Sequence, residues 1–106
     1  MDELLQRTDA FVKYVTELAK WIKDEEKEFP YVEKLIDTAR DIHDSLCSIL
    51  DYPANIYADY TRIISQTDEF SDYMEFLVKT NVLTEVQSKP LLADCVYIKD
   101  EIGKSF

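Results

Sequence analysis

The clearest feature of the chain is a repeat of apolar side chains every three or four residues, which is the spacing of one helix face. Before Pro30, this stripe continues for about six helical turns. It consists of Leu4, Thr8, Phe11, Val15, Leu18 and Ile22. Flanking apolar residues widen the stripe, as a globular bundle requires more than a two-stranded coiled coil does. The pattern therefore predicts a helix over about residues 3–27.

Two further stripes follow, and proline separates each from its predecessor. Pro30 disfavours helical backbone angles at Phe29, and Pro53 is tolerated in the first turn of a new helix. The second stripe is Val32, Leu35, Ala39, Ile42, Leu46 and Ile49, and the third is Ile56, Tyr60, Ile63, Thr67, Phe70, Met74 and Leu77. We predict helices over about 31–50 and 53–80, the latter ending at Thr80 and Asn81 because Asn tolerates the left-handed conformation.

The fourth segment opens with a capping-box pattern, Thr84 to Gln87, and closes at Gly103. Its core stripe is Leu91, Cys95, Ile98 and Ile102. Pro90 leaves two interpretations: the helix begins at Ser88, or an irregular first turn runs into it from Thr84. We predict the second, with the helix over about 85–103.

Four amphipathic segments joined by short connections favour antiparallel neighbours. The sequence therefore predicts an all-α fold, an up-down-up-down antiparallel four-helix bundle. A chain of 106 residues has room for one such domain, covering residues 1–106.

Composition narrows the classes of function. Acidic residues outnumber basic ones 22 to 12, a net charge of −10, which argues against a bare phosphate-binding surface. No stretch reaches the roughly 18 apolar residues of a membrane span. The opening Met1-Asp2-Glu3 has the wrong charge for a presequence, and two cysteines without paired spacing fit a reducing compartment. We expect a cytoplasmic protein with no membrane contact.

The acidity is concentrated in the middle of the chain. Residues 35–78 contain nine acidic and two basic residues, a net charge of −7. Two triplets at helical spacing make up most of it: Asp37, Asp41 and Asp44, and then Asp68, Asp72 and Glu75. Like charges at these spacings repel each other. The functional interpretation is that both triplets bind a basic partner, and the alternative is that they only keep the protein soluble.

Candidate chemistry is sparse. His43 and Cys47 lie four residues apart, as two metal ligands would, but zinc needs further ligands, which Asp44 or Cys95 would have to supply. A di-iron site needs Glu-x-x-His, and the residue three before His43 is Arg40. A Cys47–His43 nucleophile would need an orienting group and a pocket that no pattern indicates. One glycine cannot form a phosphate loop. We expect no metal, no cofactor and no enzymatic activity.

Aromatic residues are numerous, and several lie beside the core stripes. These flanking residues are Tyr14, Trp21, Tyr31, Tyr57 and Tyr73. They either widen the core or form a subunit or partner interface, in which Tyr and Trp are enriched.

Two stretches carry a family resemblance: Tyr52-Pro53-Ala54-Asn55-Ile56-Tyr57-Ala58-Asp59, and the C-terminal run containing Asn81-Val82-Leu83-Thr84-Glu85-Val86-Gln87 and Asp100-Glu101-Ile102-Gly103-Lys104. They resemble a bacterial four-helix-bundle family that includes proteins encoded in ribosomal-RNA intervening sequences and accessory proteins of diversity-generating retroelements. The resemblance implies an up-down protomer, often in a ring-like pentamer, without catalytic residues. Retroelement members bind nucleic acid and a reverse transcriptase through basic surfaces, which the middle helices of this chain lack.

Three functional hypotheses follow. The first is a non-enzymatic bundle that acts through protein–protein contacts as a homo-oligomer, adaptor or accessory protein. The second is a phage-type acidic inhibitor that occupies the basic nucleic-acid channel of a host defence enzyme. The third is an RNA- or DNA-binding accessory protein of a retroelement, with Lys13, Lys20 and Lys27 as contacts. The net charge makes the third the least favoured.

Overall fold

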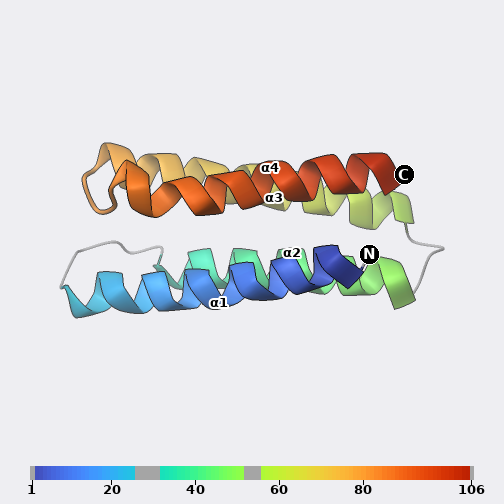
Figure 1. Cartoon of the computed structure of the whole chain (residues 1–106), viewed down its shortest axis with the longest axis horizontal. Helices are drawn as coiled ribbons and strands as arrows, with labels where there is room; N and C mark the ends of the chain where they lie inside the picture. Colours follow the sequence, from blue (N-terminus) through green and yellow to red (C-terminus); the bar gives the residue numbers. More distant parts are fainter. Residues whose placement is uncertain (1, 26–31, 52–55, 106) are drawn as a thin grey trace.

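The computed structural model describes residues 2–25, 32–51 and 56–105, and nearly all of them are helical. The helices are α1 (Asp2–Asp24), α2 (Val32–Asp51), α3 (Ile56–Lys79) and α4 (Glu85–Ser105). No strand occurs in this part of the chain, which confirms the predicted all-α class. The helices lie along one axis of an elongated molecule measuring 44 × 21 × 19 Å (Figure 1).

Helix ends differ slightly from the predicted ranges. The first helix ends at Asp24 rather than residue 27, and Glu25 lies in a turn whose amide donates to the Trp21 carbonyl. The expected start of the third helix at residues 53–55 lies outside the described residues, and α3 is described from Ile56. The fourth helix continues to Ser105 because Gly103 has helical backbone angles.

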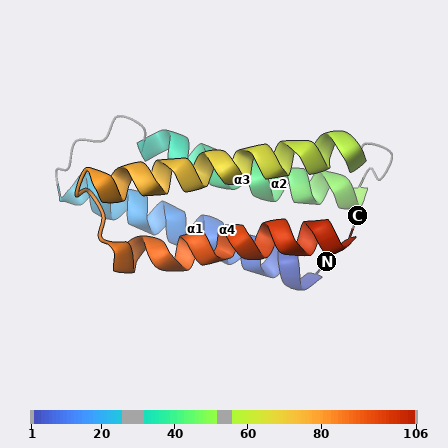
Figure 2. The ribbon, with the colours of Figure 1, turned by 90° about the horizontal axis from the view of Figure 1, so that it is seen from above.

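The stripes predicted from the sequence meet in one hydrophobic cluster between the helices. Every position of the predicted α1, α2 and α4 stripes is buried. Each helix packs against two neighbours: α1 and α3 both contact α2 and α4 (Figures 1 and 2). Phe11 of α1 and Phe70 of α3 meet across the centre, with ring centroids 4.9 Å apart in an edge-to-face arrangement. This pair links the two helices that are not direct neighbours.

Two threonines belong to the buried stripes without leaving a hydroxyl unsatisfied. The Thr67 hydroxyl donates to the Ile63 carbonyl at 2.7 Å, and the Thr8 hydroxyl donates to the Leu5 carbonyl at 3.0 Å. Both bonds return to the preceding helical turn, which is the usual way for a Thr to occupy a helix interior. Both hydroxyls are therefore hydrogen-bonded, so a threonine at these core positions leaves no buried polar group unsatisfied.

The turn between α3 and α4 contains the C-terminal cap that Thr80 and Asn81 predict. Asn81 has a φ of 63°, in the left-handed region. The Val82 amide donates to the Leu77 carbonyl at 2.9 Å and the Asn81 amide to the Val78 carbonyl at 3.1 Å, which together form a Schellman motif. The predicted C-terminal cap is therefore confirmed.

The predicted capping box starts α4. The Thr84 amide donates to Gln87 Oε1 at 2.9 Å, and the Gln87 amide donates to Thr84 Oγ1 at 3.2 Å. The helix begins at Glu85, so Pro90 lies inside it, as expected of a first turn running in from Thr84. The proline is exposed, and its missing N–H removes one hydrogen bond from the first turns.

Side-chain contacts between the helices show which of their residues lie side by side. Lys23 near the end of α1 forms an ion pair with Glu33 near the start of α2, while Thr8 contacts His43. Further along, Ser48 donates to Asp59 at 3.1 Å, and Lys99 donates to Asp68 at 2.7 Å. Both chain termini lie at one end of the molecule (Figure 1).

Among the described residues, no helix has the length and apolar character to cross a bilayer.

Candidate functional surfaces

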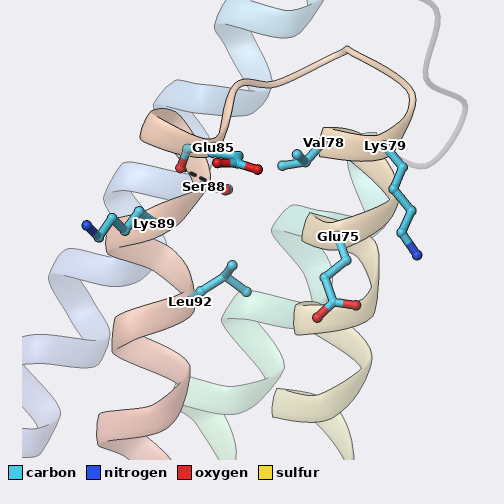
Figure 3. Close-up of a pocket in the computed structure, with 7 residues that line it drawn as sticks. All are labelled: Glu75, Val78, Lys79, Glu85, Ser88, Lys89 and Leu92. Atoms are coloured by element: carbon cyan, nitrogen blue, oxygen red, sulfur yellow. Dashed lines mark hydrogen bonds between the residues drawn. The ribbon is translucent and has the colours of Figure 1, made fainter.

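A groove of about 540 Å³ lies between the C-terminal end of α3 and the start of α4. Val78 and Leu92 point into it from opposite walls (Figure 3). Ser88 is buried in the wall, where its hydroxyl donates to the Glu85 carbonyl at 3.1 Å. The groove therefore has an apolar floor and no buried polar group that needs a ligand. It is suited to an apolar side chain from a protein partner.

The rim of the groove is charged in a balanced way. Each wall supplies one acid and one base four residues apart: Glu75 and Lys79 on α3, and Glu85 and Lys89 on α4. Figure 3 shows the two glutamates beside the groove, whereas the two lysines extend away from it on opposite sides. The rim has no net charge, although the whole chain carries −10.

Apolar side chains continue from the groove onto the outer face of α4. Val86 is 81% exposed and Val96 is 58% exposed, and Pro90 and Ala93 between them are also exposed. The apolar side chains of α4 are the least confined to one face among the four helices. A helix that keeps valines in water next to an apolar groove is typical of a contact surface.

The acidic triplet of α3 lies on this same side of the molecule. Asp68 forms an ion pair with Lys99 of α4 at 2.7 Å, and Glu75 lines the groove beside the two lysines. The Asp68 carboxylate raises the pKa of Lys99, chiefly through their hydrogen bond. Asp72 is exposed on α3 and lines a shallow hollow with Asp68 and Glu69. Lys99 of α4 thus offsets the charge of Asp68 in this triplet.

The acidic triplet of α2 lies in different surroundings. Asp37, Asp41 and Asp44 are all exposed, and the last two line a polar cleft with Ser45, Ser48, Arg62 and Gln66. Arg62 is already engaged, because its guanidinium donates to the buried Asp59 at 3.3 Å. The two triplets therefore do not merge into one acidic surface. They lie at different seams, α2–α3 and α3–α4.

The flanking aromatics separate into exposed and partly buried residues. Tyr14 is 39% exposed on α1, whereas Trp21 and Tyr73 are partly buried and pack against the core. The Tyr73 hydroxyl also donates to Glu69 at 2.9 Å. Tyr31 and the Tyr57 side chain lie outside the described residues. Tyr14 is thus the candidate interface aromatic with the most accessible ring.

Two cysteines lie in contrasting environments. Cys95 of α4 is buried, and loss of water raises the pKa of its thiol to about 11. Cys47 of α2 is partly exposed, with its Sγ 3.8 Å from His43 Nε2. The other ring nitrogen of His43, Nδ1, lies 2.8 Å from Thr8 Oγ1 of α1. Sequence reasoning paired His43 with Cys47 but gave no signal for Thr8, which belongs to the core stripe.

The remaining candidates from the sequence are a metal site and a nucleic-acid contact through Lys13, Lys20 and Lys27. Within the described ranges, no group of three or more His, Cys, Asp or Glu is placed to hold a metal ion. Lys13 and Lys20 are exposed on α1, but Lys13 forms an ion pair with Asp9 at 3.0 Å. Lys27 lies outside the described residues.

The sequence pattern did not reveal the groove, because it depends on two helices meeting. The sequence feature that corresponds to the groove is the pair of valines that α4 leaves exposed. In comparisons with known proteins, no family model, curated protein or solved structure matches this chain.

Proposed function

We propose that the protein is a non-enzymatic contact module that pairs with a second copy of itself through the groove side of α3 and α4. The observation that supports this most directly is the apolar groove with its neutral rim, continued by Val86 and Val96. An apolar surface of this kind is stabilised by being covered, and the exposed valines of α4 extend it beyond the groove. A bundle without catalytic residues is also what the family resemblance implies.

Electrostatics favours this side for self-association. Two molecules of net charge −10 repel each other unless they meet where the charge is locally balanced. Residues 79–106, from the last residue of α3 through α4, contain four basic and four acidic residues, so this stretch has no net charge. In a two-fold pair, the outward-reaching Lys79 and Lys89 of one copy can meet Glu75 and Glu85 of the other.

We further infer that the helices run up, down, up and down, each antiparallel to the next. In both α1–α2 and α2–α3, contacts pair a residue late in one helix with a residue early in the next: Lys23 with Glu33, and Ser48 with Asp59. Contacts further from each connection join an earlier residue of the first helix to a later residue of the second. Thr8 with His43 and Ser45 with Gln66 are such contacts. This arrangement leaves α4 next to α1 and exposes its outer face.

Size-exclusion chromatography with light scattering at tens of micromolar protein tests the association. We expect a mass above that of the 12.4 kDa monomer. Leu92→Lys in the groove floor should yield a monomer, whereas the control Phe76→Lys, at a half-exposed α3 residue outside the groove lining, should not. A strict monomer for the unaltered chain contradicts the proposal. A pentamer instead of a pair would favour the ring that the family resemblance implies.

A charge exchange tests the rim more sharply. One variant carries Lys79→Glu and Lys89→Glu, and the other carries Glu75→Lys and Glu85→Lys. Each variant alone should self-associate weakly, because like charges then face each other. An equal mixture should recover association, since each copy again meets the opposite charge. Failure of the mixture to associate, when the unaltered protein does, would place the contact elsewhere.

The α2 triplet supports a second proposal, a basic protein partner at the α2–α3 seam, as an acidic inhibitor of a nucleic-acid-binding protein would have. Asp37, Asp41 and Asp44 are all exposed, and Asp41 and Asp44 line the polar cleft at this seam. Binding to such a partner should weaken steeply with salt, because charges are screened over about 10 Å at 0.1 M. Reversing the α2 triplet to Lys should abolish binding, and reversing Asp72 alone should affect it little. Equal losses from both changes would contradict this assignment.

A further inference from the structure

The side chains of Thr8, His43 and Cys47 form a line from the core to the surface between α1 and α2. Thr8 is fully buried, while His43 and Cys47 are partly exposed. The line joins Thr8 Oγ1 to His43 Nδ1 at 2.8 Å and His43 Nε2 to Cys47 Sγ at 3.8 Å. The three groups are ordered as an orienting hydroxyl, a base and a thiol.

One placement of the protons satisfies the Leu5, Thr8 and Cys47 contacts together, with the ring proton of His43 on Nδ1. Thr8 has one hydroxyl proton, and that proton is donated to the Leu5 carbonyl at 3.0 Å. The hydroxyl oxygen can then only accept from His43, so both contacts form at once when Nδ1 carries the proton. The lone pair of Nε2 is left facing Cys47 Sγ, where it accepts the thiol hydrogen.

We propose that Cys47 is a site of reversible covalent modification by small disulfides, with His43 as the base that activates its thiol. His43 Nε2 takes the Cys47 proton, and the thiolate attacks one sulfur of the disulfide. The bond between the two sulfurs of the small molecule breaks as the new bond to Cys47 forms. The leaving thiolate takes away the electron pair and receives the proton from His43. One disulfide is consumed and one is formed, so no further oxidant is required.

Cys95 provides an internal reference for this proposal. It is a thiol of the same chain, buried against α3, with a pKa raised to about 11, and it lies beside no histidine in the described structure. A difference in reactivity between Cys47 and Cys95 can therefore be measured in one protein under one set of conditions. Exposure and an adjacent base both favour Cys47.

The experiment measures the rate of reaction with dithiobis(nitrobenzoate), which releases a coloured thiolate, and then with oxidised glutathione by mass spectrometry. Cys95→Ser leaves Cys47 as the reporter, and Cys47→Ser leaves Cys95. We expect Cys47 to react at least roughly tenfold faster than Cys95 and to form the glutathione mixed disulfide. Equal rates for the two thiols would overturn the proposal.

His43→Gln and Thr8→Val, each combined with Cys95→Ser, test the role of the base. Removing His43 should slow Cys47 roughly tenfold, and removing the Thr8 oxygen should slow it by a smaller factor, because the ring loses its orientation. Loss of packing would act in the opposite direction, since unfolding exposes the thiol and speeds its reaction. An unchanged or faster rate in His43→Gln would show that His43 does not activate Cys47.

Discussion

The two pairs of consecutive helices, α1–α2 and α3–α4, both bury an apolar stripe but have different seams. The first seam contains a polar line, Thr8 to His43 to Cys47, and an ion pair between Lys23 and Glu33. The second seam ends in an apolar groove, and its cysteine is buried. Each pair of helices also carries one acidic triplet, and in the α3 triplet Asp68 forms an ion pair with Lys99 across the seam.

This difference shows that similar patterns on isolated helices acquire separate chemistry from the neighbouring helix. Asp68 and Asp41 look equivalent in the sequence, but α4 places Lys99 opposite the first, whereas the second lines a cleft whose Arg62 is bound to Asp59. Likewise, Cys47 and Cys95 are both small residues on or beside the core-facing side of their helices. Thr8 on α1 orients a histidine beside the first, and burial against α3 isolates the second.

The largest effect is expected where the two pairs of helices meet, at the Phe11–Phe70 pair. Phe70 is fully buried, so Phe70→Ala should leave a cavity and lower the free energy of unfolding by about 3–5 kcal/mol. Urea denaturation followed by circular dichroism measures this loss. Phe76→Ala is the matched control on the same helix, because Phe76 is half exposed, and should cost far less. Similar losses from both would mean that the two pairs of helices are not joined through Phe70.

The second prediction separates the two cysteines by pH. Burial raises the pKa of Cys95 to about 11, so the folded state binds this proton more tightly than the unfolded chain, whose thiol ionises near pH 9. The stabilisation is complete below that pH and is lost as the pH rises to about 11, an effect of roughly 2–3 kcal/mol.

Cys95→Ala should remove this part of the loss between pH 9 and 11, whereas Cys47→Ala should retain it. The measurement is the free energy of unfolding as a function of pH for the three proteins. If Cys95→Ala destabilises equally at all pH values in this window, its thiol does not titrate with unfolding.

The third prediction concerns the turn that shapes the groove. Asn81 has a φ of 63°, where a side chain with a Cβ is strained, so Asn81→Ala should lower stability by about 1 kcal/mol. Asn81→Gly should keep or slightly raise stability, because glycine adopts this conformation without strain. Thermal denaturation distinguishes the two variants. An Ala variant as stable as the Gly variant would mean that the Schellman closure adds little.

Most of the fold could be predicted from the sequence because its signals are local. The three- and four-residue spacing identified the buried stripes, and Thr84 with Gln87 identified the start of α4. The first helix is shorter than its pattern suggested, since Glu25 lies in a turn. The stop of α3 at Asn81 was likewise readable, because few residues tolerate a positive φ.

The candidate surfaces could be predicted only in part, because they depend on which helices become neighbours. The sequence located the acidic triplets but not the lysines that face one of them. It paired His43 with Cys47, which lie one turn apart, but could not place Thr8 beside them across 35 residues. The groove has no linear signature except the valines that α4 leaves exposed.

The smallest effect is expected from the acidic triplets themselves. Asp68→Asn removes the ion pair with Lys99, but both side chains are substantially exposed, so the stability loss should be well below 1 kcal/mol and should fade as salt is added. The same change lowers the pKa of Lys99 toward its ordinary value, because the carboxylate that raises it is gone. Asp41→Asn should be neutral or slightly stabilising, since it removes like-charge repulsion from Asp37 and Asp44. Urea denaturation at low and high salt compares the two, and identical responses would mean that the α3 triplet is no better compensated than the α2 triplet.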